Sequence, residues 1–138
     1  MGQNMTDKTF HVLMVDDDED DIFAIRRGIM SSKYNIDFAS VSSADALFSL
    51  LKDGTHLAPD IILMDVNMPR MNGFEALERL KADDKWAEIP IMILSTSAHD
   101  VDSFKAKRLG AAGFATKFSS MNEMNEWVSS LEEFLLSQ

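Results

Sequence analysis

Short apolar runs alternate along this chain with longer segments in which apolar residues recur at helical spacing. The apolar runs predict strands at 11–15, 35–40, 61–64, 91–94 and 113–116. Helices are expected between them: one that carries Ile22, Ile25 and Ile29, followed by helices at 43–52, 73–82, 100–109 and 121–136. This alternation of strand and helix is typical of an α/β fold, a parallel sheet with helices on both faces.

A polar residue stands at the carboxyl end of most of the predicted strands. Asp16 and Asp17 follow the first strand, Asp65 the third, Ser95 the fourth and Lys117 the fifth. In a parallel sheet these ends meet at one edge, where the ligands of α/β proteins bind. We therefore expect these side chains to form one site.

The three carboxylates of this set would repel one another and raise one another's pKa unless a positive charge compensates them. A hard divalent cation with oxygen ligands is the natural compensation, and Mg²⁺ often binds beside a phosphate with few protein ligands. Asp65, at the centre of the expected edge, is then placed to attack phosphorus and form an acyl phosphate. Lys117 would offset charge on the phosphoryl oxygens, and Ser95 would donate a hydrogen bond to them.

Each of these residues, considered alone, has a more ordinary explanation. An isolated lysine such as Lys117 usually lies on the surface, and an isolated serine such as Ser95 is usually a loop hydroxyl. The acids at 18–21 are expected to form a solvated helix start, where the helix dipole favours negative charge, rather than to be ligands. The hypothesis of a phosphoryl site therefore depends on the whole set.

The charge balance limits the partners. With 23 acidic and 13 basic residues the net charge is −10, which argues against binding of nucleic acid or of an anionic membrane surface. The chain has no cysteine, its first residues contain no apolar signal region, and no apolar run approaches the roughly 20 residues that span a bilayer. We expect a cytoplasmic protein with a flexible tail at 1–9 and a single domain at 10–138.

Four motifs give the chain a family resemblance. They are Val15-Asp16-Asp17, Met64-Asp65-Val66-Asn67-Met68-Pro69 with Asn72-Gly73, Leu94-Ser95-Thr96-Ser97, and Thr116-Lys117. In this order and spacing they resemble the receiver domains of two-component response regulators, over about residues 10–137. The acidic opening and the Ser-Thr-Ser variant resemble the stand-alone receivers found beside bacteriophytochrome-type kinases. The resemblance implies a CheY-like, flavodoxin-like sheet in the order 2-1-3-4-5 with no attached output domain.

The resemblance also assigns roles at the site. It implies that Asp65 accepts a phosphoryl group from the phosphohistidine of a sensor kinase or a histidine phosphotransfer protein. Asp16, Asp17, Asp65 and the main-chain carbonyl of Asn67 would hold Mg²⁺. The chain would be a signalling protein that catalyses only its own phosphorylation and dephosphorylation.

Further implied roles concern the phosphoryl group and the signal. Ser95 and Lys117 would grip the phosphoryl group, while Asn67 and Ser97 would tune the water that hydrolyses the acyl phosphate. Phe114 matches the family's switch aromatic, whose rotamer follows the hydroxyl. The surface of the fourth helix, fifth strand and fifth helix would bind an unknown downstream protein or a second copy of the chain.

One departure from the family pattern lies beside Lys117. The family usually has a proline after this lysine, in a cis peptide, whereas Phe118 follows here. Because a cis bond before a residue other than proline costs about 2.5–4 kcal/mol, we expect either a trans bond with a re-routed loop or a strained cis bond. The departure leaves open where the ammonium group points.

Two other functions remain open. A degenerate receiver would bind partners without phosphorylation. A magnesium phosphohydrolase of the haloacid-dehalogenase type also uses an aspartate at a strand end. Such enzymes typically carry a second aspartate two residues further on, where this chain has Asn67.

Overall fold

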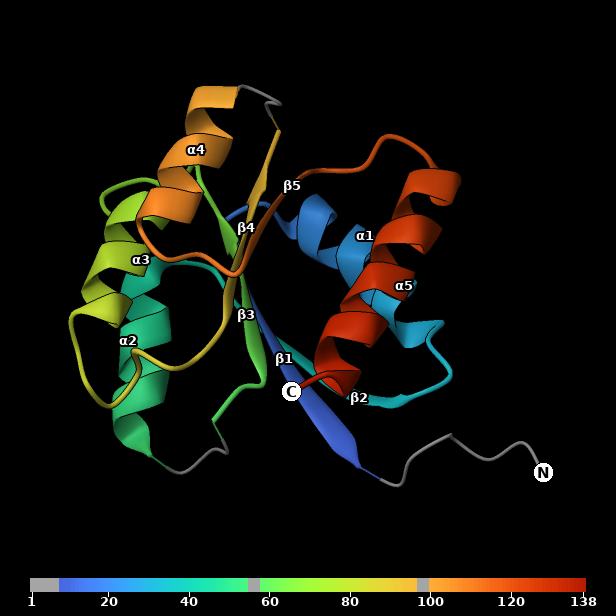
Figure 1. Ribbon diagram of the computed structural model, residues 1–138, viewed down its shortest axis with the longest axis horizontal. Helices are drawn as coiled ribbons and strands as arrows, with labels where there is room; N and C mark the ends of the chain where they lie inside the picture. The colour runs from blue at the N-terminus through green and yellow to red at the C-terminus, as the bar shows by residue number, and fades with distance from the viewer. Residues whose placement is uncertain (1–7, 55–57, 97–99) are drawn as a thin grey trace.

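The computed structural model describes residues 8–54, 58–96 and 100–138. Within them five parallel strands form one sheet with helices on both sides (Figure 1). The elements in chain order are β1 (Thr9–Val15), α1 (Glu19–Met30), β2 (Asn35–Val41), α2 (Ala44–Asp53), β3 (Ile61–Asp65), α3 (Gly73–Lys81), β4 (Ile91–Ser95), α4 (Asp100–Arg108), β5 (Gly113–Thr116) and α5 (Met121–Leu136). The order β2-β1-β3-β4-β5 confirms the predicted α/β fold and its strand order. None of the helices in this described part is long and apolar enough to cross a membrane.

The helices form two layers. α2, α3 and α4 lie over one face of the sheet, and α1 and α5 lie over the other (Figure 1). β3 runs through the middle of the sheet and is buried at every position, which is why its sequence carries no polar residue before its last one. Because side chains alternate across a strand, Ile62 and Met64 pack with α2 and α3, while Ile61 and Leu63 pack with α1 and α5.

Three strands extend one residue beyond their predicted ends, and in β3 and β4 the extra residue is polar. β3 ends at Asp65, which pairs with β4, and β4 ends at Ser95, which pairs with β5. The sheet therefore holds the backbone of both residues. At the opposite edge β1 begins at Thr9, within its ladder with β2, so the strand includes one residue that the sequence analysis assigns to the tail.

The loop after β3 is held close to Asp65 by the start of α3. Asn72 caps α3: its side chain accepts from the Glu75 N–H, and the Glu75 side chain accepts from the Asn72 N–H, both at 2.9 Å. The Gly73 N–H donates to the Val66 carbonyl at 2.9 Å. A Cβ at Gly73 would lie 2.2 Å from the carbonyl oxygen of Asp65, so this close approach requires glycine.

The turn from β5 to α5 contains the peptide bond whose isomer the sequence leaves open. The described residues contain no cis peptide bond, so the Lys117–Phe118 bond is trans. Phe118 is half-buried among the side chains between the sheet, α1 and α5, with its ring centroid 5.1 Å from that of Trp127. The Lys117 N–H donates to the Ser95 carbonyl at 2.7 Å, so the pairing of β5 with β4 reaches the lysine.

Candidate functional site

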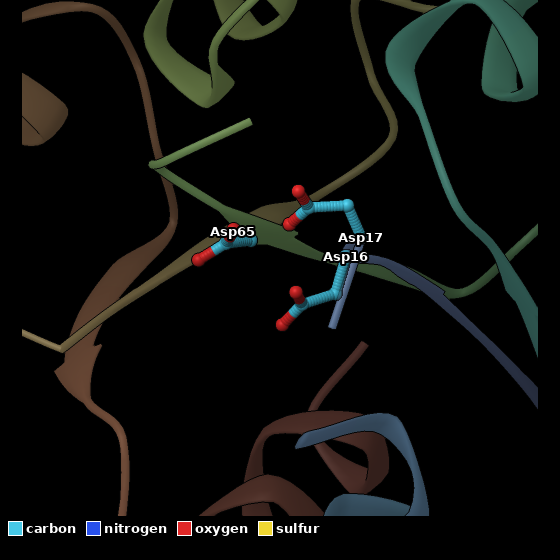
Figure 2. A group of neighbouring side chains, drawn as sticks. All are labelled: Asp16, Asp17 and Asp65. Atoms are coloured by element: carbon cyan, nitrogen blue, oxygen red, sulfur yellow. The ribbon is translucent and has the colours of Figure 1, made fainter. Parts of the chain in front are cut away.

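The carboxyl edge of the sheet brings the three predicted acids together. Asp16 and Asp17 follow β1, and Asp65 is the last residue of the neighbouring β3. Each carboxyl group offers an oxygen within 4.8 Å of the others, and Figure 2 shows the three groups converging on one space. Asp16 and Asp65 are buried, whereas Asp17 is exposed to solvent.

The ammonium group of Lys117 lies against two of these acids and against a further one. Its Nζ is 2.8 Å from Asp16 Oδ2, 2.9 Å from Asp65 Oδ1 and 2.7 Å from Asp21 Oδ2. These contacts join the ends of β1, β3 and β5 to the first turn of α1. The trans bond to Phe118 therefore leaves the ammonium aimed at the predicted site.

Burial and the interactions between charges shift the pKa values of Asp16, Asp65 and Lys117. Burial raises the pKa of Asp65 to about 6; the hydrogen bond from Lys117 opposes this shift, and the charge of Asp16 adds to it. Burial also raises the pKa of Asp16 above its usual value, against the hydrogen bond from Lys117. Burial would lower the pKa of Lys117, but hydrogen bonds to Asp16, Asp21 and Asp65 outweigh it and raise that pKa. At pH 7 Lys117 is thus charged and Asp65 is mostly ionised.

The donor set fits a hard divalent cation. Two buried carboxylates and one exposed carboxylate supply only oxygen donors, as Mg²⁺ sites in proteins do. A cation at this position would offset the repulsion between Asp16, Asp17 and Asp65 that contributes to the raised pKa of Asp65. In the part of the chain that the structure describes, this is the one cluster of acids or histidines with such spacing.

The structure describes three of the other predicted site residues. Ser95 is buried at the end of β4, one position beyond the residue that pairs with Asp65. Asn67 is exposed two residues after Asp65. Phe114, in β5, is half-buried and lines a groove whose other walls come from α4 and α5. Ser97 lies outside the described residues.

Asp21 is a contact of the site that the sequence analysis misses. The expectation of a helix start is correct for Asp18, which caps α1 by accepting from the N–H groups of Asp20 and Asp21. It is incomplete for Asp21, whose carboxylate turns inward to Lys117. A signal for this exists in the sequence, because Asp21 precedes the buried Ile25 by one helical turn and so extends the inward-facing stripe of α1.

Comparisons with known proteins find similar sequences and similar folds. The family model described as response regulator receiver domain matches residues 12–129. Among solved structures, the phosphorylated cyanobacterial phytochrome response regulator RcpA is 28% identical with a TM-score of 0.84, over 94% of this chain and 96% of that chain. The Mn²⁺-bound form of response regulator Rcp1 shares the fold, with a TM-score of 0.80 at 22% identity over 91% of this chain and 93% of that chain.

Curated relatives are similar over part of their length. Protein PilH of Pseudomonas aeruginosa is 41% identical over 69 residues, which are 47% of this chain and 57% of PilH. Response regulator GacA of the same species is 32% identical over 114 residues, which are 82% of this chain and 50% of GacA. The chain thus spans about half the length of the curated relatives it matches.

Proposed function

The chain belongs to the response regulator receiver domain family, and from this premise we propose that Asp65 accepts a phosphoryl group in a Mg²⁺-dependent reaction. The donor would be the phosphohistidine of a sensor kinase or of a histidine phosphotransfer protein. The observation that carries the proposal is the position of Asp65. It is buried at a strand end, 2.9 Å from the Lys117 ammonium, with an oxygen within 4.8 Å of oxygens of Asp16 and Asp17.

The reaction would exchange one bond to phosphorus for another. A carboxylate oxygen of Asp65 attacks the phosphorus, and an O–P bond forms while the P–N bond breaks and its electron pair returns to the imidazole. The attacking oxygen must be ionised, and a pKa of about 6 allows this at pH 7. Burial of Asp65 also limits the access of the water that would hydrolyse the acyl phosphate.

The neighbouring residues would balance the charge of the phosphoryl group. The ligands of Mg²⁺ would be Asp16, Asp17, Asp65 and the main-chain carbonyl of Asn67. When bound, the ion supplies positive charge to the phosphoryl oxygens. Lys117 would supply a second positive charge from the carboxyl end of β5. The contacts of its ammonium with Asp16 and Asp65 support this role.

The remaining roles concern the lifetime and readout of the phosphorylated state. Ser95 would donate its hydroxyl hydrogen to a phosphoryl oxygen. Asn67 and Ser97 would tune the approach of the hydrolytic water. Phe114 would change its rotamer with the hydroxyl, and its place in the groove between α4 and α5 supports this assignment.

The signal would leave through the surface of α4, β5 and α5. Val101 and Phe104 on α4 are 76% and 73% exposed, which supports docking of a downstream protein or of a second copy of the chain. RcpA, which is described as a phytochrome response regulator, supports a phytochrome-type kinase as the phosphoryl donor. The chain would thus act by phosphorylation-dependent binding.

Labelling with acetyl phosphate and Mg²⁺ tests the proposal. The wild type should gain an acid-stable, base-labile phosphate, and Asp65→Asn should gain none. The matched control is Asp60→Asn, which removes an acid at the opposite end of β3 and keeps an oxygen that can accept from the His11 N–H. Labelling of Asp65→Asn, or a wild type that neither acetyl phosphate nor a partner kinase labels, would contradict the proposal.

A further inference from the structure

Lys117 has three N–H donors on its ammonium group, and each faces a different carboxylate. The acceptors are Asp16 at 2.8 Å, Asp65 at 2.9 Å and Asp21 at 2.7 Å. Two of these acceptors have other roles in the proposed reaction, because Asp65 would receive the phosphoryl group and Asp16 would bind the cation. Asp21 is outside the group of described acids whose spacing suits a metal ion.

We propose that Asp21 is a positioning residue, which keeps the Lys117 ammonium at the carboxyl edge of the sheet while the phosphoryl group arrives at Asp65. This role rests on the proposed function. Mg²⁺ would compete with the Lys117 ammonium for Asp16, and the phosphoryl group would compete with it for Asp65. Neither competes with it for Asp21. A lysine has a long, flexible side chain, so without Asp21 the ammonium would gain freedom at the moment when its other two contacts change.

The location of Asp21 is set independently of its ion pair. Asp18 Oδ1 accepts from the N–H groups of Asp20 at 2.9 Å and Asp21 at 3.4 Å, which orders the first turn of α1. The Asp18 N–H donates in turn to Asp16 Oδ1 at 2.9 Å. One helical turn further on, Ile25 is buried against the sheet. α1 therefore presents the Asp21 carboxylate from a fixed position that is tied by hydrogen bonds to the predicted metal ligand Asp16.

The pair between Asp21 and Lys117 differs from an ordinary surface ion pair, which contributes little. The Asp21 side chain is 33% exposed, but that of Lys117 is only 13% exposed. The other two acceptors of the ammonium are buried. Charge-assisted hydrogen bonds in such surroundings are short and strong, and the loss of one should therefore be measurable.

The experiment compares Asp21→Ala and Asp21→Glu with Asp20→Ala in labelling by acetyl phosphate at saturating Mg²⁺. Asp20 is the matched control, because it is exposed in the same turn and is not among the described acids that contact Lys117. Asp21→Ala should lower kcat/KM for acetyl phosphate about tenfold, as expected for the loss of one charge-assisted hydrogen bond. Asp21→Glu keeps a carboxylate and should recover most of the rate. The Mg²⁺ dissociation constant should change no more in Asp21→Ala than in Asp20→Ala.

A second readout follows Lys117 itself, without any phosphodonor. In protein labelled with nitrogen-15 lysine, the ammonium signal of Lys117 is assigned with Lys117→Arg, and its hydrogen exchange with water is measured. Because three carboxylates hold these hydrogens in the wild type, exchange should become faster in Asp21→Ala and stay unchanged in Asp20→Ala. A merely structural role for Asp21 would lower the urea midpoint without changing this exchange.

The outcomes separate the two proposals. Equal labelling rates in Asp21→Ala and Asp20→Ala would overturn the positioning role, and so would a slower rate with unchanged ammonium exchange. If neither acetyl phosphate nor a partner kinase labels the wild type, the proposed function fails, and the exchange measurement then decides alone. In that case faster exchange in Asp21→Ala only supports the placement of Lys117 by Asp21, and unchanged exchange overturns it.

Discussion

Replacing Asp65 with asparagine should make the protein more stable at neutral pH. Burial raises the pKa of Asp65 to about 6 from an ordinary value of 3.8, although the hydrogen bond from Lys117 opposes the shift. Between these two pH values the folded state keeps a proton on Asp65 that the unfolded chain has lost. Ionisation of Asp65 therefore costs folding free energy, and the stability that this group contributes falls as the pH rises from about 4 to about 6. Asparagine has nearly the same shape and cannot ionise.

The size of the effect follows from the shift in pKa. A difference of about 2 units, at about 1.36 kcal/mol per unit, sets an upper value of about 3 kcal/mol at pH 7. We expect Asp65→Asn to raise the free energy of unfolding by about 2–3 kcal/mol there. At pH 4 the carboxyl group is neutral in the folded wild type, so the gain should shrink to about 0.5 kcal/mol.

Urea unfolding from pH 7 to pH 4, in the presence of EDTA, measures this difference. Asp84→Asn is the control: Asp84 is an exposed acid between α3 and β4, and its replacement should change stability by no more than about 0.5 kcal/mol. Two results would refute the reasoning. One is an Asp65→Asn protein that is less stable than the wild type at pH 7, and the other is a gain of the same size at pH 7 and pH 4.

Three further predictions also concern stability. Mg²⁺ at 100 times its dissociation constant should raise the free energy of unfolding by about 2.7 kcal/mol. Asp17→Ala should need more Mg²⁺ than the wild type for the same rise in Tm. If the Tm of both proteins rises equally at each Mg²⁺ concentration, Asp17 is not a ligand of the metal. Gly73→Ala should lower the free energy of unfolding by about 2–3 kcal/mol, because its Cβ would lie 2.2 Å from a backbone oxygen. Gly28→Ala should lower it by less than about 1.5 kcal/mol, because its close contact at 2.6 Å is with a flexible methionine side chain. A larger loss in Gly28→Ala than in Gly73→Ala, measured by urea unfolding, would contradict this. Lys117→Met should cost about 3 kcal/mol at pH 7 and less at pH 5, because it leaves the buried Asp65 without its cation; a loss that is independent of pH would argue against that cause.

The central strands β3 and β4 are predictable because burial on both faces favours apolar residues before their last positions. β3 is the clearest case: Ile61 to Met64 are apolar in the sequence and buried in the structure. The meeting of the strand ends then follows from topology, since parallel strands point their carboxyl ends to one edge. The last residues of β3 and β4 are harder to assign, because Asp65 and Ser95 are polar and yet continue the ladder.

The acidic run after β1 is less predictable, because its carboxylates look alike in the sequence and differ only in direction. Asp16 is buried beside Asp65. Asp18 turns back to cap α1, and Asp21 turns inward to Lys117. Periodicity separates these directions only after the first residue of α1 is known, and the sequence leaves that residue open within the run. The phase of one helix therefore decides which acid belongs to the site.

The direction of the Lys117 side chain is set by contacts in which Phe118 takes no part. Its N–H is hydrogen-bonded to the Ser95 carbonyl at 2.7 Å, which places its backbone at the end of the sheet. Its ammonium lies within 2.9 Å of carboxylates after the end of β1, at the end of β3 and in the first turn of α1. The side chain of Phe118 instead packs on Trp127, so the residue at this position matters for how α5 begins. The missing proline therefore does not displace the Lys117 ammonium from the predicted site. Strand pairing holds the backbone of Lys117, and the carboxylates hold its ammonium.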